Sequence, residues 1–234
     1  MKFASLISIG AIAGTVYGQQ PGGQINSPEA LASPGTGPYA AHFFEDPSLP
    51  KYVIYQPKEI PAGFKAPLLV WGNGGCLNVG TIMAPFLLQL ASQGVVVIAT
   101  GPKEDPSKGG TYESFGSYGQ AKPEALTAAI DWAEKSTRDP KWAHIDTSRG
   151  KRDYGILPQV PAFMSNWAAT GHGGTYNEPT GGEYGIAASH WVNWILRGQT
   201  SSAAWFKDDG GATAAGWTEV GSKYFDRLEI PSPL

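Results

Sequence analysis

Two short runs of consecutive apolar residues constrain the fold of this chain most strongly. They are APLLVW at 66–71 and VVVIAT at 95–100. Neither run alternates between apolar and polar residues, which is typical of strands buried on both faces of a parallel sheet. Between them, residues 81–94 carry apolar side chains at helical spacing and end at Gly94, a helix stop. The pattern predicts a βαβ unit and hence an α/β fold.

Further elements follow from the same signals. Residues 51–56 are rich in β-branched and aromatic side chains and end at Pro57, so they predict a strand. Helical periodicity predicts helices over 122–137 and 183–198, and an apolar run within 160–170 is compatible with one more strand. No apolar strand is found between Ser136 and Val160. The predicted sheet is therefore short of strands for a doubly wound enzyme.

The amino-terminal segment has the pattern of a secretory signal peptide. Lys2 supplies one positive charge, and the apolar stretch that follows it is too short to span a bilayer. We expect a signal peptide over residues 1–18, a Pro/Gly/Ser-rich leader over 19–40 and a single domain over 41–234. A buried amino-terminal helix is the alternative that this leader disfavours. The expected location is extracellular.

Charge and composition limit the partners. The chain has 17 Lys and Arg against 20 Asp and Glu, a formal net charge of −3, and no long basic run. We therefore expect no nucleic-acid partner, and no second apolar run is long enough to predict a membrane span. Four scattered histidines and one cysteine lack the spacing of a metal site, so no metal or cofactor is expected. A single cysteine also excludes an internal disulfide.

The first segment that could carry chemistry is WGNGGC, residues 71–76, directly after a predicted parallel strand. Open α/β sheets bind their ligands at this end of the strands. Asn73, Gly74, Gly75 and Cys76 could form a loop whose backbone N–H groups approach a substrate oxygen, as in an oxyanion hole. A plain tight turn is the alternative, because Asn-Gly is also a strong turn signal.

The second segment is GHGGTYNEPTGG, residues 171–182, between the 160–170 run and a predicted helix. His172 lies among glycines and is a candidate general base, because imidazole titrates near neutral pH. A surface or capping histidine is the alternative. For His42, His144 and His190 we expect only structural roles.

Taken together, these segments resemble a family of secreted fungal α/β-hydrolases similar to carboxylesterases. The resemblance rests on WGNGGC, VVVIAT and GHGGTYNEPTGG in that order, followed by WVNWILRG, and covers nearly the whole chain after the leader. It implies an α/β-hydrolase-like fold, a mostly parallel sheet with helices on both faces. It also implies that the loop at Asn73, Gly74 and Gly75 forms the oxyanion hole and that His172 is the base of a catalytic triad.

Such a hydrolase needs a nucleophilic serine in a G-x-S-x-G elbow and an acid on a later loop. No serine of this chain has glycines at both positions, and the nearest match is Ser117 in FGSYG. In the family the elbow follows a stretch similar to IDTSR, 145–149. Here Arg149 is followed directly by a segment similar to a region beyond the acid. We therefore expect a deletion of roughly 60 residues or more, including central strands, near Arg149 and Gly150.

The missing serine leaves His172 with nothing to deprotonate. Loss of the nucleophile removes roughly six orders of magnitude of rate in a serine hydrolase. Cys76 is a conceivable replacement, but it lies on the oxyanion loop and not on an elbow. Three acids could orient His172 without supplying the reacting atom: Asp146, Asp153 and Glu178.

Three hypotheses follow. In the first, the protein is an ester hydrolase whose recorded sequence is incomplete, through mis-splicing or a faulty gene model. In the second, it is an inactive hydrolase relative, a pseudoenzyme, that keeps a groove for a small ester or similar ligand. The third, a carbohydrate-binding module, is motivated by eight tryptophans, although several of these lie at helix positions expected to be buried.

Overall fold

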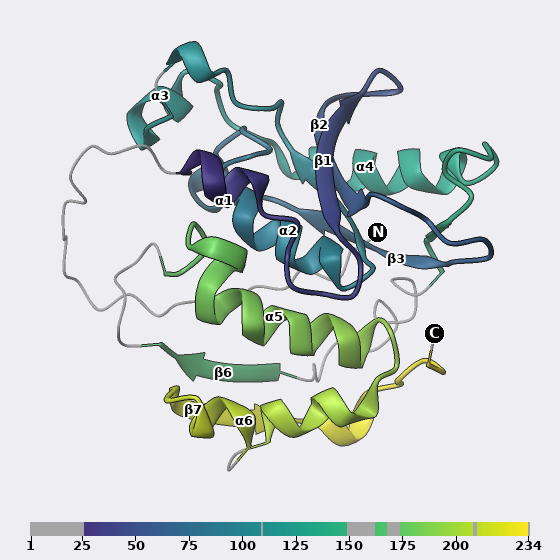
Figure 1. Ribbon diagram of the computed structural model, residues 1–234, viewed down its shortest axis with the longest axis vertical. Coiled ribbons are helices and arrows are strands. Elements are labelled where there is room, and N and C mark those ends of the chain that lie inside the picture. Colours follow the sequence, from purple (N-terminus) through teal and green to yellow (C-terminus); the bar gives the residue numbers. More distant parts are fainter. Residues whose placement is uncertain (1–25, 109, 149–161, 168–173, 208–209, 234) are drawn as a thin grey trace.

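The computed structural model describes residues 26–108, 110–148, 162–167, 174–207 and 210–233. It has a mixed α/β architecture, with a five-stranded sheet covered by helices and a separate two-stranded sheet (Figure 1). The α/β class predicted from the apolar runs is therefore confirmed. His172, Asp153, Arg149 and Gly150 lie outside the described residues.

The main sheet has the strand order β1-β2-β4-β3-β5. Strands β3, β4 and β5 run parallel, whereas β1 pairs antiparallel with β2 and β2 pairs antiparallel with β4. The sheet is mixed, so the expected parallel arrangement is found in only half of it. The strands are β1 (Ala41–Asp46), β2 (Leu49–Pro57), β3 (Ala66–Trp71), β4 (Val96–Thr100) and β5 (Ile145–Asp146).

Helices cover both faces of this sheet, as the apolar strands require. Successive residues of a strand point to opposite faces, so Val97 packs with α2 (Ala84–Ser92) and α5 (Gly182–Ile195), whereas Ile98 packs with α4 (Pro123–Ser136). All five residues of β4 are buried. A strand covered on both faces in this way has no polar face, which explains its unbroken apolar sequence.

Helix α2 is buried along its whole length. The amino-terminal segment from residue 26, which includes α1 (Pro28–Ala32), lies against it. Gln89 of α2 accepts a hydrogen bond from the Thr36 backbone N–H at 2.9 Å, and the Gly37 N–H donates to Ser92 Oγ at 2.9 Å. The described part of the predicted leader thus packs on the domain and satisfies polar groups of a buried helix.

The second sheet lies on the far side of α5 from α2 (Figure 1). It pairs β6 (Ala162–Asn166) with β7 (Thr218–Lys223) in antiparallel orientation. The strand expected within 160–170 is therefore present, but it belongs to this small sheet and not to the main one. The remaining elements are short: α3 (Tyr112–Gly116), α6 (Gly211–Ala214), η1 (Gly74–Cys76), η2 (Pro106–Lys108), η5 (Pro179–Gly181), η6 (Thr200–Phe206) and η7 (Phe225–Arg227).

One strand was missed between Ser136 and Val160. Strand β5 has only two residues, Ile145 and Asp146, which pair with Ala66 and Pro67 at the start of β3. Two residues are too few to produce an apolar run, so periodicity could not reveal them. Beyond Asp146, the described part of the chain supplies no strand that pairs with the rest of β3 on this side.

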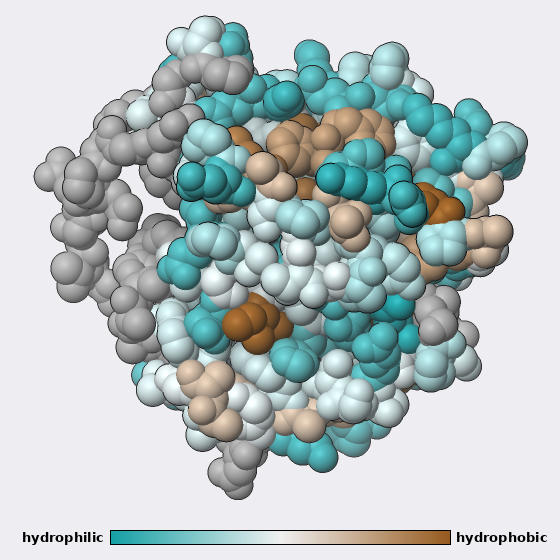
Figure 2. Space-filling model, in the orientation of Figure 1, coloured by the Kyte–Doolittle hydropathy of each residue, from teal (hydrophilic) through white to brown (hydrophobic). Residues whose placement is uncertain are grey.

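The surface shown in Figure 2 is mostly hydrophilic or neutral, with hydrophobic colour in separate patches. Among the described residues, the exposed large hydrophobic side chains are Ile186, which is 44% exposed, and Tyr224, which is 38% exposed. Within the same residues, no helix combines the length and the apolar character that a membrane crossing needs.

Candidate functional site

The loop from Asn73 to Cys76 lies at the carboxyl end of β3. β4 is the parallel neighbour of this strand, and Trp71 near the end of β3 pairs with Ala99 of β4. Ligands of open α/β sheets bind at this edge. The structure therefore places the loop at the edge that the sequence indicated, and its role as an oxyanion loop stays a prediction.

The side chain of Asn73 holds the loop in shape. Its Oδ1 accepts a hydrogen bond from Trp71 Nε1 at 2.9 Å, and its Nδ2 donates to the Leu77 carbonyl at 3.1 Å and the Val79 carbonyl at 2.8 Å. The residue is buried, so these bonds are protected from water. Because this amide already uses both groups, Asn73 positions the loop and leaves ligand contacts to the backbone.

The backbone of Gly74, Gly75 and Cys76 forms a tight left-handed turn. The Leu77 N–H donates to the Gly74 carbonyl at 3.3 Å, and φ is +62° at Gly75 and +56° at Cys76. Glycine adopts this conformation readily, whereas Cys76 adopts it at a steric cost. The tight turn that the sequence offered as the alternative is thus present, and the same turn can also present its amides to a ligand oxygen.

The loop is exposed, and open space surrounds its two glycines. A Cβ atom added at Gly74 or Gly75 would meet no other atom within 4 Å. The N–H groups of Gly74 and Gly75 donate no hydrogen bond to any other described residue. Free N–H groups beside open space are what an acceptor oxygen of a ligand requires.

Cys76 itself is exposed, and it is the free cysteine of the chain. Its carbonyl accepts a hydrogen bond from the Ala121 N–H at 2.8 Å, which ties the loop to the segment before α4. The residue lies in the turn after β3, and α2 begins only at Ala84, so Cys76 is not at a direct strand-to-helix elbow. Its position therefore gives no support for a replacement nucleophile.

The structure describes the GHGGTYNEPTGG segment, the histidine motif, only from Gly174 onward. Gly174 has φ +55°, and any side chain there would collide with the ring of Tyr184. Thr175 is buried, where its Oγ1 donates to the Gly181 carbonyl at 2.7 Å and accepts from the Tyr184 N–H at 2.9 Å. Gly174 and Thr175 therefore help to build a fixed turn that leads into α5.

Tyr176 connects the two predicted segments. Its ring lies edge-on to the ring of Trp71, with centroids 6.1 Å apart, and edge-on to Phe86 at 5.0 Å and Tyr184 at 4.8 Å. The structure thus brings the GHGGTYNEPTGG segment against the residue that holds Asn73. Sequence reasoning missed Tyr176, although it lies inside the quoted motif, because attention to titratable groups near neutral pH favoured His172.

The other residues considered from the sequence are spread over the fold. Ser117 is exposed at the end of α3, where its Oγ donates to the Ser114 carbonyl at 2.7 Å. Asp146 ends β5 and accepts the Ser148 N–H at 3.0 Å in a local turn. Glu178 is exposed beside Gly182. None of these contacts forms part of a nucleophile-and-base pair.

Three histidines have a pKa below the ordinary value because burial disfavours the charged imidazole: His42, His144 and His190. A nearby Lys58 lowers the pKa of His42 further. His144 Nε2 lies 3.2 Å from Gln56 Oε1, and the His190 ring stacks on Trp205. Their surroundings agree with the structural roles expected for them, and among the described residues no serine or cysteine hydrogen-bonds to a histidine.

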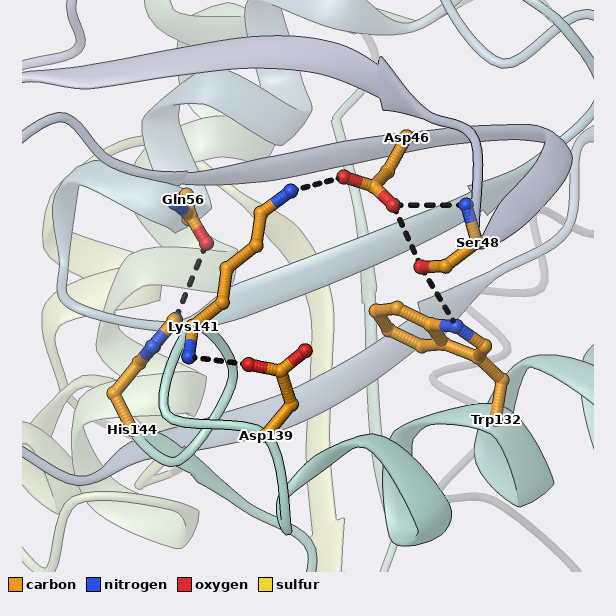
Figure 3. A network of polar contacts seen from close by, with 7 residues as sticks. All are labelled: Asp46, Ser48, Gln56, Trp132, Asp139, Lys141 and His144. Atoms are coloured by element: carbon orange, nitrogen blue, oxygen red, sulfur yellow. Dashed lines mark hydrogen bonds and ion pairs between the residues drawn. The ribbon is translucent and has the colours of Figure 1, made fainter.

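The polar network in Figure 3 fastens the β1–β2 hairpin to the chain around α4. Asp46 accepts hydrogen bonds from the Ser48 N–H at 2.9 Å and the Ser48 Oγ at 2.6 Å, and it pairs with Lys141. Burial would raise the pKa of Asp46, but the bonds from Lys141 and Ser48 hold it below its ordinary value. Trp132 Nε1 donates to Ser48 Oγ at 3.3 Å. These groups satisfy one another, so the network is structural.

Comparisons with known proteins identify no family. No protein-family model matches the chain, and no curated protein matches it. Within the part of the chain that is described, no group of three or more His, Cys, Asp or Glu side chains could hold a metal ion. The carboxyl edge of β3 therefore stands as the candidate site on its geometry alone.

Proposed function

We propose that this protein is a secreted relative of the α/β-hydrolases that binds a carbonyl compound at the Asn73–Cys76 loop and does not turn over esters through an acyl-enzyme. The observation that carries the proposal is the pair of amides at Gly74 and Gly75, which have no acceptor among the described residues and lie in an exposed loop at the carboxyl end of β3. Their acceptor would be a carboxylic ester or carboxylate oxygen.

The order of the elements supports the hydrolase relationship. In α/β-hydrolases one oxyanion N–H comes from the loop between the third strand and the following helix. Here the Asn73–Cys76 loop follows β3 and precedes α2. The strand that would lead into the nucleophile elbow corresponds to β5, which stops after two residues. This combination is what a hydrolase sheet without its elbow strand would retain.

The absence of turnover follows from chemistry. An acyl-enzyme needs a nucleophile within hydrogen-bond reach of a base, roughly 2.6–3.2 Å. The sequence has no G-x-S-x-G serine, and within the described residues no serine or cysteine hydrogen-bonds to His42, His144 or His190. Donors alone can bind an ester oxygen, yet they cannot form the covalent bond.

The carbohydrate-binding alternative has less support. Trp142, Trp194, Trp205 and Trp217 are buried. The half-buried Trp71, Trp132, Trp167 and Trp191 pack against other aromatic rings. Stacking on a sugar needs an exposed ring face, so core packing explains these tryptophans better.

The test combines binding with turnover. Calorimetry with methyl butyrate and with butyrate should detect saturable binding, and Gly74→Val should weaken it more than about tenfold by filling the open space without a clash. Gly221→Val in β7, where an added Cβ also meets nothing, is the matched control and should bind as the wild type does.

Neither the wild type nor these two variants should hydrolyse p-nitrophenyl butyrate. Equal binding by both variants would refute the site, and turnover that His172→Ala abolishes would refute the inactive assignment.

A missing coding segment remains a separate explanation of the absent elbow. Sequencing the transcript tests it directly. Recovery of an in-frame segment with G-x-S-x-G between Arg149 and Gly150 would show that the full protein contains a nucleophile elbow and would predict hydrolase activity for it. A transcript that matches the present chain would reject this explanation.

A further inference from the structure

We infer that the hydroxyl group of Tyr176 is a hydrogen-bond donor to the ligand oxygen at the Asn73–Cys76 loop. The inference rests on the proposed binding function and adds to the site a residue from a distant segment of the sequence. The ligand chemistry is an acceptor oxygen of the kind that esters and carboxylates share.

The position of the ring is the first observation. Tyr176 contacts Trp71, whose indole N–H is bonded to Asn73. The tyrosine is therefore separated from the loop by a single side chain. Among the described aromatic residues, this contact is the one that joins the histidine motif to Trp71 at the end of β3.

The second observation is that the ring is held in place. Phe86, Tyr184 and Trp71 each meet it in an edge-to-face arrangement, and Phe86 is 1% exposed. Such pairs contribute about 0.5–1.5 kcal/mol beyond burial, so the ring is ordered before a ligand arrives. A donor on a fixed ring loses little side-chain entropy on binding.

The third observation concerns the hydroxyl. It makes no hydrogen bond to any described residue, and it is not among the fully buried polar atoms that lack a partner. The residue is half-buried and its hydroxyl is not fully enclosed, so this group can meet a partner from outside the chain. Buried tyrosines usually find a partner for this group, and here the partner is free to be a ligand.

The charge of the group is also suited to this role. Burial, with a smaller effect from Tyr184, raises the pKa of Tyr176 to about 12. The phenol therefore stays protonated throughout the neutral and moderately alkaline range. A protonated phenol donates to an ester or carboxylate oxygen, whereas a phenolate would repel a carboxylate.

Tyr176→Phe tests the inference, because it removes the hydroxyl and leaves the ring contacts intact. We expect binding of both methyl butyrate and butyrate to weaken about three- to tenfold, the effect of one net hydrogen bond. Tyr39→Phe is the matched control. Its ring packs beside Phe64 and Gly94, before the start of β4, and its hydroxyl also lacks a partner within the described chain, so binding should not change.

The outcomes separate the two proposals. Loss of binding in Gly74→Val with unchanged binding in Tyr176→Phe overturns the role of Tyr176 and keeps the proposed function. No binding by the wild type overturns both. If Tyr176→Phe weakens the binding of only one of these ligands, the hydroxyl donates either to a carboxylate oxygen or to an ester oxygen. This result supports the inference in a narrower form. Urea unfolding of both tyrosine variants shows that any loss of affinity is not a loss of fold.

Discussion

The ring of Tyr176 lies edge-on to the ring of Trp71 with 6.1 Å between their centroids, although the two residues belong to distant segments of the chain. Trp71 ends β3, and Tyr176 belongs to the turn before α5. This contact places the start of α5 next to the carboxyl edge of the sheet. Any ligand bound at the Asn73–Cys76 loop would therefore have the turn that contains Tyr176 nearby.

Phe86 supports this contact, because its ring packs against the rings of both Trp71 and Tyr176. Replacing it with alanine should lower the free energy of unfolding by about 3–5 kcal/mol, since a buried aromatic ring is lost and a cavity remains. Urea unfolding measures this change. Ile186→Ala is the control: this side chain is 44% exposed, and its loss should cost less than about 1 kcal/mol. Similar costs for both variants would contradict the packing described.

Stability should fall as the solution is acidified. Burial lowers the pKa of His42, His144 and His190 below the ordinary value of 6.5 in the folded protein. Below that value the unfolded chain binds protons that the folded chain resists, so the stabilisation is present above pH 6.5 and is lost as pH falls through the lowered folded-state pKa values. Urea unfolding at about pH 7.5 and about pH 5 should show the decrease.

His42→Phe isolates one contribution to this acid sensitivity. His42 Nε2 is buried without a partner, and its ring already packs beside Phe44. The variant should lose less stability between the two pH values than the wild type does. The comparison is needed because burial also raises the pKa of Glu104, which acts in the opposite direction. An equal loss in the two proteins would show that His42 does not contribute.

Asp46→Asn should destabilise the protein by about 1–3 kcal/mol, because Ser48 and Lys141 lose a charged acceptor in a buried position. Lys141→Met should cost less than about 1 kcal/mol, since its side chain is 57% exposed and its charge is screened. Thermal unfolding of both variants tests this order. The contribution of Asp46 is present above the ordinary pKa of 3.8 and is lost as pH falls through its lowered value. A larger effect at Lys141 would reverse the assignment.

Arg197 is a buried cation without a carboxylate partner in the described chain. It is 6% exposed, its Nε and Nη1 have no acceptor, and its guanidinium lies over the rings of Tyr39 and Phe64. Two unpaired donors at about 1–3 kcal/mol each outweigh a cation–π attraction of about 2 kcal/mol. Arg197→Met should therefore raise the free energy of unfolding by about 1 kcal/mol, whereas Arg197→Ala should lower it by leaving a cavity. Chemical unfolding distinguishes these results, and destabilisation by methionine would mean that the charge itself is needed.

Local patterns predicted the central part of the fold well. The run 66–71 coincides with β3, and the run 95–100 contains β4. The predicted helix over 122–137 contains α4, and the predicted helix over 183–198 matches α5 except at its ends. These elements are long or wholly apolar, so their periodicity is strong. β1 was missed because His42, Glu45 and Asp46 interrupt its apolar pattern, and β5 because two residues form no pattern.

The candidate site was only partly predictable. The Gly-rich composition at 71–76 and at 171–182 indicated two loops of special backbone geometry, and both are such loops where they are described. Composition could not show that the Asn73 side chain hydrogen-bonds to residues of its own loop, or that the Tyr176 ring packs against Trp71. Those relationships depend on which groups the packed chain brings together.

The sequence by itself determined which segments of this chain are buried and where the chain turns. Apolar runs and glycines indicate these features locally, because they depend on residues adjacent in the sequence. The tertiary structure decided the pairing: β2 inserts antiparallel beside β4, β6 leaves the main sheet for β7, and the two glycine loops meet through Trp71 and Tyr176. Strand partners and ring contacts join residues that are far apart in the chain, so their energies arise only when the whole core is packed.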